Sequence, residues 1–161
     1  GSDVGAALAA HKDINQIVFT GSVLTGRAIL HAAAERAVPC VMELGGKSAA
    51  VVFADADLEQ LMDSINWGIF FNAGQVCSAM SRLLVERSIY DQLVERIASF
   101  AKGLKIGPGI HNNDITPVMS AAQQKKVLHY CDEATQQGAT LITGGKKPAG
   151  HKGYFVEPTT K

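Results

Sequence analysis

"QIVFTGSVLTGRAILHAAAERAVPCVMELGG", residues 16–46, carries the clearest structural pattern in the chain. The apolar run at 16–21 predicts a buried strand that ends in glycine. Residues 24–37 place their apolar side chains in one stripe at helical spacing, and Pro39 ends that pattern. Because a second short apolar run follows at 40–44, this stretch predicts two parallel strands joined by a helix.

The rest of the chain continues this alternation of strands and helices. Capping signals support two of the helices: Asp57 with Gln60, and Ser120 with Gln123. The first of these helices should end near Gly74. In chain order, further helices are predicted at 2–13, 55–72, 88–104 and 120–138, and further strands at 49–53, 82–87, 139–145 and 154–160. The predicted fold class is therefore α/β.

Composition excludes several classes of partner. The chain has 161 residues, enough for one domain or a large piece of a bigger one. Fifteen Lys and Arg balance fifteen Asp and Glu, so the formal net charge is zero and no basic stripe suggests nucleic acid. The longest apolar runs fall short of the roughly 18 residues that a membrane helix needs. Neither nucleic acid nor a membrane is expected as a partner.

The cysteines and histidines indicate a reducing compartment and no metal. Cys40, Cys77 and Cys131 are odd in number and widely spaced, which argues against a disulfide framework. No secretory signal is visible, so a cytoplasmic location is expected. No two histidines lie four residues apart, and no Cys/His pair has zinc spacing, so no metal site is expected.

The turn at "FTGSVLTGR" joins the first strand to the following helix. Gly21 and Gly26 bracket it with the spacing GxxxxG, and Ser22 lies just before the helix. Free N–H groups and the dipole at a helix N-terminus favour a phosphate. Taken alone the signal is weak, because a Gly-Ser turn between a strand and a helix is common.

The sequence "MELGGKS" places Glu43 at the end of an apolar strand, before two glycines. A buried carboxylate without a partner is expensive. The side chain therefore either points to solvent or serves as a general base whose pKa is raised by apolar surroundings.

The sequence "FFNAGQVCSAMSR", residues 70–82, surrounds Cys77 with small residues. Small neighbours leave room for a substrate, and consecutive N–H groups in a turn can stabilise an oxyanion. For a single cysteine, a buried structural role is the alternative, and Cys40 in a strand and Cys131 on a helix fit that role.

Taken together, these motifs resemble the NAD(P)-dependent aldehyde dehydrogenase superfamily. The order "FTGS", "ELGGKS" and "FFNAGQVCSA" agrees with that family, and so does the separation of 34 residues between Glu43 and Cys77. The segments "FADADL", "GATLITGG" and "GYFVEPT" also look like the family, so the resemblance covers essentially the whole chain.

The resemblance implies a role for each matching residue. Cys77 is expected to attack the aldehyde carbon, to form a thiohemiacetal and then a thioester, and to offer its N–H to the oxyanion. Glu43 is expected to activate the water that hydrolyses the thioester. NAD is the expected cofactor, with NADP as the alternative. The residues expected at the cofactor are Gly21, Ser22, Gly26, Leu44 and Gly45, and those expected to support the cysteine loop are Asn72, Gly74 and Gln75.

The resemblance also implies that the chain is an internal fragment. Residues 1–45 look like the end of a Rossmann-like NAD-binding domain, and residues 46–161 like the first part of an α/β catalytic domain. The family's oxyanion asparagine and its cofactor-ribose lysine would precede this chain. The isolated 161 residues are therefore expected not to oxidise aldehydes. The full-length protein is expected to form a homodimer or homotetramer.

Several alternatives to this reading remain. The sequence "GQVCSAMSRLLV" is closest to the betaine-aldehyde and aminoaldehyde branch, and a broad aliphatic or semialdehyde enzyme is the alternative. Enzymes that pass the thioester to coenzyme A generally lack the glutamate, so Glu43 favours hydrolysis. A cysteine amidase needs a partner histidine, and no histidine here has a supporting motif. A non-catalytic truncated paralogue stays open.

Overall fold

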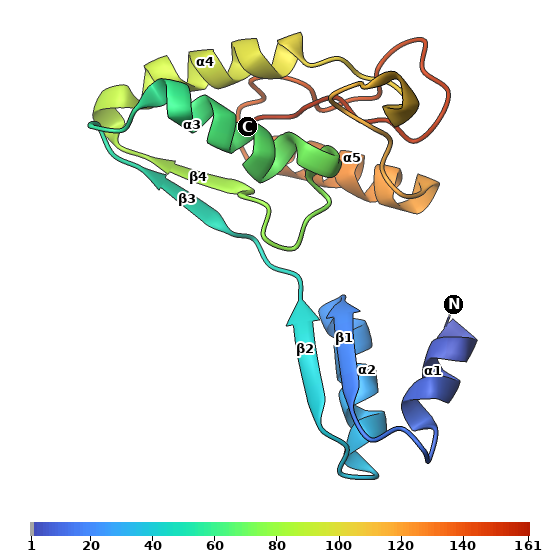
Figure 1. Cartoon of the computed structure of the whole chain (residues 1–161). Helices are drawn as coiled ribbons and strands as arrows, with labels where there is room; N and C mark the ends of the chain where they lie inside the picture. Colours follow the sequence, from blue (N-terminus) through green and yellow to red (C-terminus); the bar gives the residue numbers. More distant parts are fainter. Residues whose placement is uncertain (1) are drawn as a thin grey trace. The chain divides into compact units, whose positions relative to one another are not determined.

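The computed structural model describes residues 2–161, which form two compact units with their boundary between Gly46 and Lys47. Figure 1 shows both units, coloured along the chain. Each unit contains a two-stranded parallel sheet in the part of the chain that the structure describes. Parallel strands alternating with helices confirm the predicted α/β class.

The first unit is built around the predicted strand–helix–strand segment. β1 (Ile17–Gly21) and β2 (Cys40–Leu44) pair in parallel, and α2 (Val23–Ala34) connects them and packs against both strands (Figure 1). The helix begins after Ser22, whose hydroxyl accepts a hydrogen bond from the Thr25 N–H at 3.1 Å. This N-cap satisfies one of the N–H groups that the first turn leaves without an internal acceptor.

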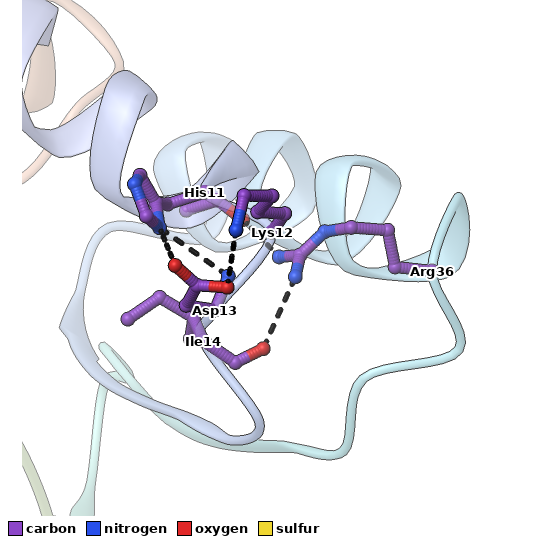
Figure 2. A network of polar contacts seen from close by, with 6 residues as sticks. His11, Lys12, Asp13, Ile14 and Arg36 are labelled. Atoms are coloured by element: carbon purple, nitrogen blue, oxygen red, sulfur yellow. Dashed lines mark hydrogen bonds and ion pairs between the residues drawn. The ribbon is translucent and has the colours of Figure 1, made fainter.

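An arginine fixes the preceding helix, α1 (Ser2–Ala10), to the end of α2. The guanidinium of Arg36 donates to the carbonyl oxygens of Ala9 and Ile14 at 2.8 and 3.1 Å. Figure 2 shows this arginine near His11, Lys12 and Asp13, which follow α1. Ala9 lies in the last turn of α1 and Ile14 in the connection to β1, so Arg36 holds the end of the helix and that connection in place.

The second unit is the longer of the two and contains the remaining elements. α3 and α4 cover one face of the sheet formed by β3 and β4 (Figure 1). In chain order the elements are β3 (Ala49–Val52), α3 (Leu58–Ile65), the π-helical turn η1 (Asn66–Phe70), the 3₁₀ turn η2 (Phe71–Gly74), β4 (Arg82–Val85), the 3₁₀ turn η3 (Arg87–Ile89), α4 (Tyr90–Gly103), the 3₁₀ turn η4 (Gly109–His111) and α5 (Ala121–Gln136).

The core of the second unit lies between its sheet and these helices. Leu93 of α4 is 0% exposed. Val52 of β3, Ile65 and Phe70 from the α3–η1 segment, and Ile97 one turn further along α4 are buried with it. The apolar side of α4 that the sequence predicts is therefore the side that packs in this core.

Truncating Leu93 to alanine should destabilise the second unit by about 2–5 kcal/mol, because it leaves a cavity in a fully buried position. Urea unfolding followed by circular dichroism measures the change. Ile110→Ala is the control: Ile110 is 86% exposed, and its truncation should change the free energy of unfolding by no more than about 0.5 kcal/mol. Equal losses in the two variants would contradict this assignment of the core.

The helix predicted at 55–72 is only partly correct. Asp57 caps it as expected, with its carboxylate accepting from the N–H groups of Glu59 and Gln60. The regular helix stops at Ile65, however, and the wider turn η1 follows. Ile65 and Phe70 are both buried, and a spacing of five residues puts side chains on one face only where the helix is widened.

The strands predicted at 139–145 and 154–160 are wrong. Within the residues that the structure describes, these segments share a single antiparallel bridge between Thr143 and Thr160. Gly144 and Gly145 have φ values of +76° and +77°, so the first segment leaves the extended conformation that a strand needs.

The other predicted elements are confirmed to within a few residues at their ends. Ser120 accepts from the Gln123 N–H at 3.1 Å, and Gly138 follows α5 in a left-handed conformation with φ of +95°. No helix in residues 2–161 is both long enough and apolar enough to span a bilayer.

Candidate active site

The carboxyl ends of β1 and β2 form the first part of the candidate site. The register places Gly21 opposite Leu44 and Thr20 opposite Glu43, so the two strands end together. Ligands of open parallel sheets bind at this edge. The sequence-predicted cofactor residues that the edge brings together are Gly21, Ser22, Leu44 and Gly45.

The N-terminus of α2 lies at the same edge. The Ser22 hydroxyl accepts the Thr25 N–H and lies 2.9 Å from the Thr25 hydroxyl, so its immediate role is to cap the helix. Val23 and Leu24 are exposed, and their N–H groups belong to the first turn, where a helix offers no internal acceptor. Such N–H groups and the helix dipole favour an anion.

Gly26 lies inside α2 and not in the turn that the sequence pattern suggested. It is buried, and a Cβ built on it would come within 2.8 Å of a methyl carbon of Leu44. The absence of a side chain therefore lets α2 approach β2 closely. Gly26 is therefore explained by helix packing. The residues that could bind an anion are those that precede it in the turn.

Glu43 projects from the face of β2 that α2 does not cover. Met42 and Leu44 are half-buried towards α2, while Val41 and Glu43 alternate with them and are exposed. The apolar surroundings expected of a general base are therefore absent from the described part of the chain. The carboxylate points outwards, as the alternative expected, and it is accessible to water, the molecule that a general base would deprotonate.

Three consecutive residues before the cysteine have an unusual backbone. Asn72, Ala73 and Gly74 have φ values of 52°, 54° and 75°. Left-handed conformations are rare for residues with a Cβ, and a run of them marks a sharply turned, constrained segment. Only Gly74 adopts its conformation without a steric penalty.

Cys77 sits at the centre of a tight turn. The Ala79 N–H donates to the Val76 carbonyl at 3.1 Å, which leaves Cys77 and Ser78 as the two central residues. Cys77 is exposed, whereas Cys40 and Cys131 are half-buried. Among residues 2–161, no group accepts a hydrogen bond from the Cys77 N–H. The geometry thus offers an accessible sulfur and an uncommitted donor on one residue.

The predicted supporting residues bond to each other around the left-handed segment. The Asn72 side chain donates to the Gln75 carbonyl at 3.2 Å, and the Gln75 side chain donates to the Asn72 carbonyl at 3.1 Å. The Gln75 side-chain oxygen also accepts from the Met119 N–H at 3.0 Å. Sequence reasoning missed Met119, because no local pattern connects positions 44 residues apart.

Sequence reasoning also missed an aromatic hollow beside η1. It has a volume of about 230 Å³ and is lined by Asn66, Trp67, Phe71 and Asp114. The rings of Trp67 and Phe71 lie 5.3 Å apart, and Trp67 is 69% exposed. Two aromatic residues four positions apart at the end of a predicted helix were the available signal.

The structure thus gathers the predicted site residues in two groups. The cofactor residues and Glu43 lie in the first unit, while Cys77 and its supporting residues lie in the second.

Comparison with known proteins agrees with these motifs along the entire chain. The sequence model of the aldehyde dehydrogenase family matches residues 1–161. A mitochondrial aldehyde dehydrogenase of Leishmania tarentolae is 44% identical over 161 residues, covering 99% of this chain and 32% of the relative. A peroxisomal aminoaldehyde dehydrogenase of Pisum sativum is 45% identical with the same coverage.

A solved structure gives the same result for the fold. The betaine aldehyde dehydrogenase of Staphylococcus aureus, in complex with NAD⁺, superposes with a TM-score of 0.93 at 39% identity, covering 99% of this chain and 32% of that one. The chain thus spans about a third of the length of these relatives. It belongs to the aldehyde dehydrogenase family, with the α/β fold that its motifs predicted.

Proposed function

We propose that the protein containing this chain oxidises an aldehyde to a carboxylic acid with NAD, using Cys77 as the nucleophile and Glu43 as the general base. The observation that carries the proposal is the exposed Cys77 in a tight turn with an uncommitted N–H, within a chain of this family. Residues 1–45 would then be the end of the NAD-binding domain, and residues 46–161 the first part of the catalytic domain.

The edge of the first sheet fits a dinucleotide. The first turn of α2 would receive the pyrophosphate, next to Gly21 and Ser22, and Leu44 and Gly45 would lie towards the nicotinamide. Gly26 would contribute by allowing the helix to pack closely on β2. The solved S. aureus relative contains NAD⁺, which supports NAD over the alternative NADP.

In the proposed reaction the Cys77 thiolate forms a bond to the aldehyde carbon, and the carbonyl π electrons move to oxygen. The N–H of Cys77 donates to that oxyanion. As the oxyanion electrons re-form the carbonyl, a hydride leaves this carbon, for which bound NAD would supply the acceptor, and Cys77 then carries the thioester. Glu43 takes a proton from water as its oxygen attacks the thioester; the carbon–sulfur bond breaks, which releases the acid and the thiolate.

The aromatic hollow favours a cationic aldehyde as substrate. Trp67, Phe71 and Asp114 all line this hollow, and one oxygen of the Asp114 carboxylate accepts from the Lys105 N–H at 2.8 Å. Aromatic faces and a carboxylate both attract a quaternary or primary ammonium group. Together with the aminoaldehyde and betaine aldehyde dehydrogenases among the relatives, this supports betaine aldehyde or an aminoaldehyde over a broad aliphatic aldehyde.

An aldehyde panel with the full-length protein tests this proposal, with NAD reduction followed by absorbance. Betaine aldehyde should be used with a kcat/KM about 10-fold or more above that of tert-butylacetaldehyde, its uncharged isostere. The preference should shrink in Trp67→Ala. Equal use of both aldehydes would favour a broad aliphatic or semialdehyde enzyme. Absence of turnover with every aldehyde would favour a non-catalytic paralogue.

The isolated 161 residues should show no turnover in the same assay, and robust turnover by them would contradict the division into parts of two domains.

We further propose that the full-length protein is a homodimer or homotetramer and that it acts in the cytoplasm. The names of the relatives include mitochondrial and peroxisomal proteins, so fractionation of the source cells is the measurement that decides the location.

A further inference from the structure

We propose that Gln75 is a positioning residue, which fixes the loop of Cys77 to the backbone of Met119. This inference rests on the proposed role of Cys77 as the nucleophile. A bond between Gln75 and a distant segment of the second unit then sets the orientation of the Cys77 sulfur and N–H.

The loop needs an external restraint because its backbone is unfavourable. Asn72 and Ala73 both carry a Cβ and both have positive φ values. Such conformations persist only where the surrounding structure imposes them. A chain relieved of its restraints would return these residues to ordinary regions, and Cys77, which lies four residues after Ala73, would move with them.

Gln75 supplies restraints both within the loop and between the loop and another segment. Its side-chain N–H donates to the Asn72 carbonyl at 3.1 Å, its backbone N–H donates to the same oxygen at 3.1 Å, and its carbonyl accepts from the Asn72 side chain at 3.2 Å. These bonds close the loop on itself. The remaining atom, the side-chain oxygen, accepts from the Met119 N–H at 3.0 Å and connects the closed loop to another segment.

That segment is itself firmly held. Ile115 and Val118 are 2% and 5% exposed. The Ile115 N–H donates to the Lys105 carbonyl, and the Val118 N–H donates to the Tyr154 carbonyl, each at 3.0 Å. The Met119 side chain is 81% exposed, so its N–H is the group that this residue directs to the loop. Gln75 therefore ties a strained loop to an exposed residue that directly follows the buried, hydrogen-bonded Val118.

Gln75 affects the reaction because it is close to Cys77 along the chain. Cys77 lies two residues after Gln75, so a shift of Gln75 displaces the sulfur and the N–H together. A misplacement of about 1 Å can cost roughly 100-fold in rate, even when the changed residue does not touch the substrate. The attack of a small alkylating reagent on the thiol needs no such alignment.

Gln75→Met in the full-length protein tests the inference, because it keeps the side-chain length and removes both side-chain bonds. The expected result is a loss of about 10- to 100-fold in kcat per titrated Cys77 thiol. The KM for NAD and the rate of Cys77 alkylation by iodoacetamide should change by less than about 3-fold. The control Gln60→Met changes an exposed residue of α3 and should keep the original kcat. An unchanged kcat per thiol in Gln75→Met overturns the inference.

A second pair of variants isolates the bond to Met119. Met119→Pro removes the N–H donor, and Met119→Ala keeps it. The proline variant should reproduce the loss of Gln75→Met, the alanine variant should not, and the double variant Gln75→Met/Met119→Pro should be no worse than Gln75→Met alone. Additive losses overturn the inference. If Gln75→Met fails to fold, the Met119 pair decides alone.

Cys77→Ser separates this inference from the function on which it rests. Persistent aldehyde oxidation in Cys77→Ser would show that the proposed nucleophile is wrong. An inactive Cys77→Ser together with a fully active Gln75→Met would reject the positioning role alone.

Discussion

Replacing Cys77 with serine should abolish aldehyde oxidation by the full-length protein, with kcat/KM lower by at least about 1,000-fold. A serine hydroxyl is almost fully protonated near neutral pH and is a far weaker nucleophile than a thiolate. The tight turn offers no compensation, since within residues 2–161 no histidine or other base is hydrogen-bonded to Cys77. NAD reduction with a saturating aldehyde measures the loss.

Cys131→Ser is the matched control. Cys131 is half-buried on α5, and Thr135 and Lys161 bond to its backbone carbonyl, which the substitution keeps. Activity should therefore stay within about 2-fold of the original. Iodoacetamide should also label Cys77 faster than Cys131, because Cys77 is exposed. Equal activity losses in the two serine variants, or equal labelling rates, would refute the assignment of the nucleophile.

The strand–helix–strand segment was predictable because its signals are local. The apolar periodicity and the helix stop at Pro39 lie within one stretch of chain, and the structure has the same elements there. Asp57 and Ser120 were recognisable for the same reason: an N-cap depends on residues two or three positions away. The capping role of Ser22 was recognised only in the structure.

One error arose where distant residues decide the conformation, and the other where glycines within the segment override its β-propensity. The widening at η1 brings Phe70 to the core formed with α4, and no pattern within residues 66–70 announces it. The β-branched runs near Thr143 and Thr160 read as strands, but Gly144 and Gly145 turn the chain after one bridge. β-propensity describes how a residue fits a sheet that must already exist.

Some features of the candidate site could likewise be predicted from the sequence, and others could not. The motifs that contain Glu43 and Cys77, in their order along the chain, resemble the family whose sequence model matches the chain. The packing role of Gly26, the exposure of Glu43 and the bond from Met119 to Gln75 all depend on atoms brought together by folding. Sequence motifs therefore identify the reacting groups, while the restraints on those groups become visible only in three dimensions.

Replacing Glu43 with glutamine should stop turnover after one oxidation per site. The amide keeps the size of the side chain but cannot take a proton from water, so thioester hydrolysis should slow by about 100- to 10,000-fold. Formation of the thioester needs Cys77 and the cofactor, and stopped-flow measurement should show an initial burst of NAD reduction close to one equivalent. Steady-state kcat should then fall to the slow rate of uncatalysed hydrolysis.

Two further measurements make this expectation specific to a general base. Hydroxylamine attacks thioesters without a protein base, so it should restore turnover in Glu43→Gln. Glu35→Gln, at the exposed end of α2 in the same unit, removes an equal charge and should leave both burst and turnover unchanged. If Glu43→Gln instead loses the burst together with the turnover, the carboxylate acts before the thioester forms. The exposed position of Glu43 on the uncovered face of β2 would then mark a role in the first half of the reaction.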